Sequence, residues 1–136
     1  MVINYNNLAE LRSFYFHDSI FTGFSYDYSN CKVFLTCKNH LTQKKQEVVF
    51  HNTVFLISQN CAFWGGGNAI LGISAVSHPA EFNNLMSMRE NNSDLSDLSR
   101  LDVGGTFITL EIAINSGDVI LITCQSVEIF EVPFYA

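Results

Sequence analysis

Three neighbouring residues near the start of the chain, His17, Asp18 and Ser19, are of the types that form a hydrolytic triad. In a triad the carboxylate orients the imidazole, which takes the proton of the serine hydroxyl. Neighbours in an extended chain point to opposite faces, so these three cannot all face one substrate. We therefore interpret them as a structural polar junction, in which Asp18 or Ser19 caps backbone N–H groups and His17 makes a structural hydrogen bond.

A glycine run, residues 65–67, follows Trp64, the only tryptophan in the chain. The run lacks the Gly-Lys-Ser/Thr ending of a P-loop and the G-x-G-x-x-G frame of a dinucleotide-binding turn. Three consecutive glycines lose too much backbone entropy in a regular element, so we expect a loop. Trp64 is a candidate binding residue because Trp is enriched at binding hot spots, and packing over the edge of a core is its alternative role.

The remaining reactive side chains predict no metal site and no cofactor. The four histidines, His17, His40, His51 and His78, show no H-x-x-x-H spacing, and the four cysteines include no C-x-x-C pair. Reduced, mostly buried thiols explain the cysteines better than ligands or disulfides do. A small enzyme with a site assembled around His17 or His51 stays an alternative, because triads are recognised by geometry rather than by sequence order.

The charge is acidic and unevenly distributed. The net charge is −6, and beyond Lys45 only two arginines, Arg89 and Arg100, oppose ten acids. This acidic C-terminal part of the chain repels the phosphate backbone of nucleic acids and would attract a cationic partner. The alternative is that the acids serve only to keep an aromatic-rich protein soluble. The candidate binding acids lie on or beside the last predicted strands and are Glu111, Asp118, Glu128 and Glu131.

Strands must position most of these residues. The chain has 12 Phe and 5 Tyr, which favour pleated, half-buried surfaces. Alternating apolar residues and short connections predict an α+β, mainly β domain of about seven mostly antiparallel strands, forming a twisted sheet or a partly open barrel, with two short helices. We find no linker and expect one domain over residues 1–136. The predicted strands cover 20–28, 31–39, 47–57, 69–77, 108–114, 119–124 and 127–132.

Two details of these elements can be predicted. Asn7 is expected to cap the first helix, with Glu10 in the reciprocal position three residues later, and Pro79 suits the first turn of the second helix. The third strand alternates as far as Asn52 and then becomes the apolar run 54–57. This break predicts a bulge, or a bend into a region covered on both faces.

The chain gives no sign of a membrane. No apolar run approaches the roughly 20 residues that span a bilayer, and residues 1–10 lack the cationic and apolar regions of a signal peptide. We expect a cytoplasmic protein with no membrane partner and no nucleic-acid partner.

The run Phe-His-Asp-Ser-Ile at 16–20, between a short helix and a strand, resembles the opening of several families of small uncharacterised bacterial proteins. Some such domains are immunity proteins encoded beside toxins, so the resemblance implies a binding role and carries over no catalytic residue. We expect a non-catalytic protein-binding domain, of which an immunity-type protein that binds a cationic partner is one form. We also expect self-association through strand edges, most simply as a homodimer, and a homo-oligomeric structural protein stays a further alternative.

Overall fold

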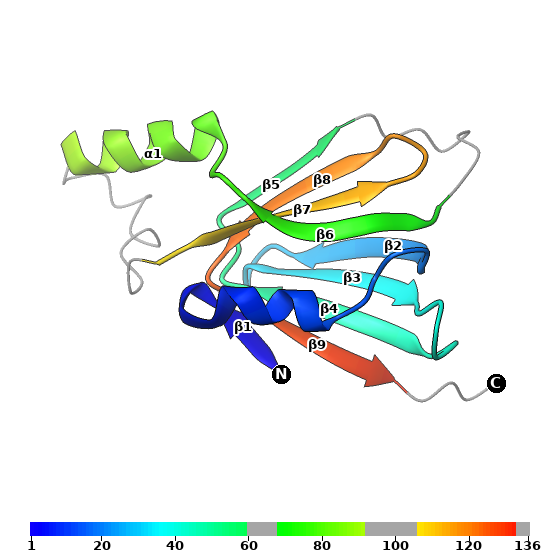
Figure 1. Cartoon of the computed structure of the whole chain (residues 1–136). Coiled ribbons are helices and arrows are strands. Elements are labelled where there is room, and N and C mark those ends of the chain that lie inside the picture. Colours follow the sequence, from blue (N-terminus) through cyan, green and yellow to red (C-terminus); the bar gives the residue numbers. More distant parts are fainter. Residues whose placement is uncertain (60–67, 92–105, 133–136) are drawn as a thin grey trace.

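The computed structural model describes residues 1–59, 68–91 and 106–132. Within this part of the chain, nine strands form two antiparallel sheets, accompanied by two helices (Figure 1). The mainly β, α+β class predicted from the alternation is therefore confirmed. The five-stranded sheet has the order β1 (Val2–Asn4), β9 (Ser126–Val132), β4 (Lys45–His51), β3 (Lys32–Lys38) and β2 (Ile20–Asp27). The four-stranded sheet has the order β5 (Phe55–Gln59), β8 (Val119–Cys124), β7 (Ile108–Ile114) and β6 (Ile70–Val76).

One pair of chain segments passes through both sheets. β4 continues into β5, and their partners β9 and β8 are continuous in the opposite direction. At the crossing, the amide of Gln125 donates to the carbonyl of His51 (3.1 Å), and the amide of Val54 donates to the carbonyl of Thr123 (2.9 Å). The break in alternation predicted as a bulge or a bend is thus a bend at which one run of strand changes sheet.

The far edges of the two sheets touch at a single bridge. Ile20 of β2 pairs with Ala69, and the amide of Phe21 donates to the carbonyl of Asn68 (2.8 Å). Beyond this bridge, β2 and β6 pair only with β3 and β7 respectively. The described strands therefore enclose the core without forming a closed barrel.

The core lies between the inner faces of the sheets. Its fully or almost fully buried members include Leu35 of β3, Phe50 of β4, Leu110 of β7 and Ile122 of β8. Along these strands, buried core residues alternate with residues that face away from the core. This alternation is the pattern from which the strands were predicted, because one face of each strand is covered and the other faces outward.

The first helix, η1 (Tyr5–Ser13), is a 3-10 helix that packs Leu8 and Leu11 against this core. The prediction that Asn7 caps it was wrong. Asn4 is the cap, because its side-chain oxygen accepts from the amide of Asn6 (2.9 Å), while Asn7 Oδ1 accepts from the amide of Asn4 (2.7 Å). The two asparagines thus form a reciprocal capping box that starts one turn earlier than expected.

The second helix, α1 (Ala80–Asn91), follows Pro79 as predicted. Its Phe82 is buried against Phe107 in a small second cluster that also contains Val54 and Phe55. α1 therefore covers only the end of the four-stranded sheet where β5 begins. No helix in the described ranges is long and apolar enough to cross a membrane.

The positions of the cysteines correct one detail of the strand predicted over residues 31–39. Cys37 lies on the core side of β3 and is buried, and so is Cys124 on β8. Cys31 and Cys37 share one parity in the sequence, which predicts that both lie on the core face of a strand. Cys31 lies instead in the turn before β3 with a left-handed backbone (φ 55°) and is only half-buried. The fourth cysteine, Cys61, lies outside the described residues.

Candidate binding surface

The junction predicted from His17, Asp18 and Ser19 links three parts of the fold. His17 donates from Nδ1 to the carbonyl of Leu71 on β6 (3.0 Å), and the buried Ser19 Oγ accepts from the amide of His40 (3.3 Å). Both bonds agree with the structural role expected for these residues. Asp18 has a left-handed backbone (φ 63°), which brings its Oδ1 to 3.5 Å from His17 Nε2. The expectation that these two neighbours point to opposite faces was therefore wrong, but the Ser19 hydroxyl is directed into the protein.

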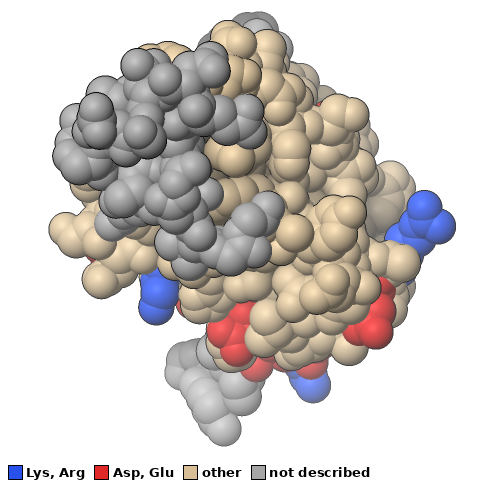
Figure 2. Space-filling model, turned by 90° about the vertical axis from the view of Figure 1, so that its left-hand side faces the viewer, with Lys and Arg blue, Asp and Glu red and all other residues tan. Residues whose placement is uncertain are grey.

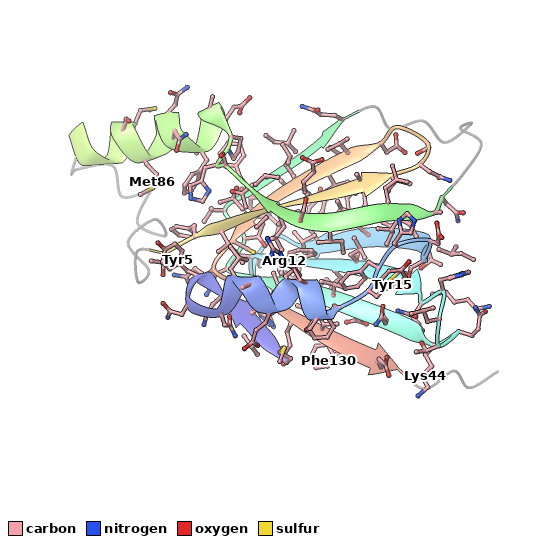
Figure 3. All side chains as sticks on the ribbon, in the orientation of Figure 1. Tyr5, Arg12, Tyr15, Lys44, Met86 and Phe130 are labelled. Carbon is pink, nitrogen blue, oxygen red and sulfur yellow. The ribbon has the colours of Figure 1, made fainter. Side chains whose placement is uncertain are left out.

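A buried amide pair holds this junction on the β3–β4 hairpin. Asn39 Nδ2 donates to the carbonyl of Tyr15 (3.1 Å) and to Gln46 Oε1 (3.1 Å), and Asn39 Oδ1 accepts from the amide of Leu41 (2.9 Å). Both amide side chains are buried, and Figure 3 labels the exposed Tyr15 beside them. Sequence reasoning missed this pair because nothing in the local pattern marks a polar residue as buried.

Two of the four candidate acids have basic partners from β4 and the loop before it. Glu128 Oε1 lies 3.0 Å from His51 Nε2, and Glu131 Oε2 lies 3.9 Å from Lys44 Nζ (Lys44 is labelled in Figure 3). The absence of basic residues around these acids holds along the chain but not in the fold. The charge of Glu131 is thus partly balanced by Lys44, and Glu128 has a hydrogen-bond partner in His51.

Glu111 is in a different environment, on the outside of the four-stranded sheet. It pairs with Ser74 of β6 and with Leu121 of β8, and its neighbours Leu110 and Ile112 point into the core. This orientation follows from the alternation of apolar residues along 108–114, since Glu111 has the parity of the residues that face away from the core. We call the two rows of residues around it, which point away from the core, the outer face: Ile57, Leu121, Glu111 and Ser74, then Gln59, Val119, Ala113 and Gly72.

The outer face belongs to a half of the molecule that carries only acidic charge among its described side chains. Over residues 53–59, 68–88 and 106–125, the acids are Glu81, Glu111 and Asp118, and no lysine or arginine occurs. Asp118 lies in the β7–β8 turn at the margin of the outer face, where its Oδ2 accepts from Ser116 Oγ (3.0 Å). A surface with one sign of charge attracts partners of the opposite sign.

A chain of hydrogen bonds that sequence reasoning missed lies on the same sheet, beneath α1. His78 Nδ1 lies 2.6 Å from Thr109 Oγ1, which lies 2.7 Å from Thr123 Oγ1. Burial lowers the pKa of His78, whose ring packs 4.8 Å from that of Phe82. A hydroxyl bonded to an imidazole is the arrangement of an activated nucleophile. Thr109, however, is only 2% exposed, so a substrate cannot reach its hydroxyl. These hydrogen bonds are therefore structural.

The cysteines and the possible metal ligands give no reactive site among the described residues either. Burial raises the pKa of Cys37 to about 11 and that of Cys124 to about 12, so both remain protonated thiols rather than nucleophiles. The described side chains contain no group of three or more His, Cys, Asp or Glu that could hold a metal ion. Trp64, the remaining binding candidate, lies outside the described residues.

The fold divides the four candidate acids between the two sheets. It brings Glu111 and Asp118 to one side of the four-stranded sheet and places Glu128 and Glu131 on the other sheet, next to basic side chains. No protein-family model matches the chain, and no curated protein matches it significantly.

Proposed function

We propose that the chain is a non-catalytic protein-binding domain and that its outer face binds a cationic protein. The observation that carries this proposal is the position of Glu111 among apolar side chains. Leu121 of β8 lies directly beside it, Val119 is the next outward-facing residue of β8, and Ile57 of β5 pairs with Leu121 on its other side. All three are half-buried, and the cluster that the described side chains of α1 form lies at the start of β5, around Phe55. Half-buried apolar side chains are typical of the core of a protein interface, and Glu111 adds to them a charge that favours a cationic partner.

The acidic charge on the half of the molecule that carries the outer face indicates that the partner is basic. The described side chains of residues 53–59, 68–88 and 106–125 include no lysine or arginine, so a basic protein would meet no like charge on that part of the surface. Complementary charge mainly raises the rate of association, and salt screens that effect. The resemblance of residues 16–20 to immunity domains suggests a toxin with a basic binding surface as one such partner. The free thiols Cys37 and Cys124 suit a reducing, cytoplasmic location, which the proposal includes.

The enzyme alternative has less support. In the part of the chain that the structure describes, His17 contacts Asp18 and the ring of Tyr15, and His51 contacts Glu128. Neither set of contacts pairs the histidine with a serine, threonine or cysteine that it could activate, and this favours binding over catalysis.

Affinity capture with matched variants tests the proposal. Wild-type protein, Glu111→Lys and a control, Glu10→Lys, would be used as baits in extracts of the source cells. Glu10 is an exposed acid on η1, so the control makes the same charge change away from the outer face. We expect a basic protein that the wild type and Glu10→Lys retain and that Glu111→Lys loses.

The captured protein would then be purified and its association rate measured at increasing salt. A rate that falls with salt for the wild type, and that Glu111→Lys lowers at every salt concentration, would support the proposal. Equal capture by all three baits, or no captured protein at all, would contradict it.

A further inference from the structure

The second half of β2 is an open strand edge. Its first residues are covered by the bridge between Ile20 and Ala69, but from Gly23 to Asp27 the strand pairs with β3 alone. In an antiparallel pair, alternate residues direct their N–H and C=O groups away from the partner strand. This stretch therefore presents backbone donors and acceptors that no described strand uses.

The side chains of this edge are unusually apolar for a position in contact with water. Phe24 is 38% exposed, Tyr26 is 62% exposed, and Tyr28 just beyond the strand is 86% exposed. β2 runs toward the end of the molecule where uncharged residues cover most of the described surface (Figures 1 and 2). Proteins usually protect such edges with lysine or proline, and between Ile20 and Tyr28 neither occurs.

We propose that this edge pairs with the same edge of a second copy, so that the two five-stranded sheets become one sheet across a two-fold axis. The sequence of the strand is compatible with that symmetry. An antiparallel pair centred on Ser25 places Phe24 of each copy opposite Tyr26 of the other, and aromatic cross-strand pairs are stabilising. The same register places Asp27, the only charged residue of β2, opposite Gly23, so no like charges meet.

A second copy fits this edge better than an unrelated strand for the same reason. The aromatic, small, aromatic order of residues 24–26 is its own complement when the strand direction is reversed. A two-fold interface requires this self-complementarity, since each residue must suit both its own position and its partner's. The inference does not depend on the outer face, which lies on the other sheet, and each can fail without the other.

The oligomeric state of Tyr26→Lys tests the inference. In the proposed register, a lysine at this position replaces an aromatic partner of Phe24 and adds one charge on each side of the axis. Tyr5→Lys is the matched control, because Tyr5 on η1 is 59% exposed (labelled in Figure 3) and lies away from β2. By analytical ultracentrifugation at micromolar concentration, we expect the wild type and Tyr5→Lys to be dimers of the 15.3 kDa chain. Tyr26→Lys should weaken dimerisation by about tenfold or more.

A cross-link tests the register itself. Ser25 is exposed and lies on the axis, so the two copies of a Ser25→Cys variant would face each other. Directly opposed residues of antiparallel strands have Cα atoms about 4.5–5.5 Å apart, within the range of a disulfide. We expect mild oxidation to link Ser25→Cys into a covalent dimer much faster than the wild type or a Ser13→Cys control on η1.

Three results would overturn the inference. The first is a wild-type monomer of 15.3 kDa at micromolar concentration, which would leave this edge open to a strand of another protein. The second is a dimer that Tyr26→Lys leaves intact, since the contact would then lie elsewhere. The third is cross-linking of Ser25→Cys no faster than that of Ser13→Cys.

Discussion

Individual polar residues determine much of how this fold is held together. Among the described residues, five polar side chains are buried: Ser19, Asn39, Gln46, Thr109 and Thr123. None of the described buried side-chain nitrogen or oxygen atoms lacks a hydrogen-bond partner. A buried polar group is costly unless it is bonded, so these residues hold specific segments in place: three fix the residues before β2 to the β3–β4 hairpin, and two lie beneath α1.

The sequence could predict the orientation of some of these residues but not their partners. Strand parity was enough to direct Glu111 away from the core. It could not show that Glu128 meets His51, because the two are 77 positions apart and come together only when β9 pairs with β4. For the same reason it missed Thr109 and Thr123, which are 14 positions apart on neighbouring strands. Pairing between distant strands depends on the whole sheet, and no local pattern encodes it.

His78 should make the stability of the protein depend on pH. Burial holds the pKa of His78 below its usual value of about 6.5. The unfolded chain therefore binds the proton first as pH falls, so this contribution to stability is complete above the ordinary pKa and is lost as pH falls through the folded value. The variant His78→Gln does not titrate, and its amide can still contact Thr109.

Urea unfolding at several pH values measures this effect. Between about pH 8 and about pH 5, the free energy of unfolding should fall more steeply for the wild type than for His78→Gln. Parallel profiles for the two proteins would show that His78 keeps its ordinary pKa in the fold.

At the scale of elements, regular strands were the predictable part. Long alternating runs such as residues 108–114 gave strands with the expected bounds, whereas β1 has three residues, too few for any periodicity to be visible. The change of pattern after Asn52 indicated a bulge or a bend, and the chain does bend there, but β5 is half-buried to exposed rather than covered on both faces. That β4 and β5 join different sheets was not predictable, because it depends on β8 and β9 bending at the same place.

Asn52 should be important for that bend. Its backbone is left-handed (φ 51°), and its Nδ2 donates to Gln125 Oε1 on the facing strand (2.8 Å). A β-branched residue strains this conformation by about 1–2 kcal/mol and also loses the hydrogen bond, so Asn52→Val should lower the free energy of unfolding by about 2 kcal/mol. Asn52→Gly loses only the bond, and its cost should stay below about 1 kcal/mol. Equal losses for the two variants in urea unfolding would mean that the backbone at Asn52 is not a constraint.

At the scale of the whole molecule, the apolar interior is divided into two unequal parts. The main core unites both sheets and η1, whereas α1 contributes to a separate cluster in which Phe82 and Phe107 are the buried members, with ring centroids 5.5 Å apart. A helix of 12 residues is marginal without tertiary contacts. α1 therefore depends on a few side chains, while the sheets depend on many.

This division predicts that α1 can detach while the sheets stay folded. Phe82→Ala removes the main anchor of the helix, so the amides of α1 should exchange with deuterium much faster. The amides of β7 and β8 should keep their protection, because their core side is packed by other residues. The comparison is Leu110→Ala on β7, which creates a cavity in the main core. It should lower the stability of every element by about 2–5 kcal/mol. If Phe82→Ala instead reduced protection in β7 and β8 as much as in α1, the two clusters would unfold together, and the molecule would be a single cooperative unit.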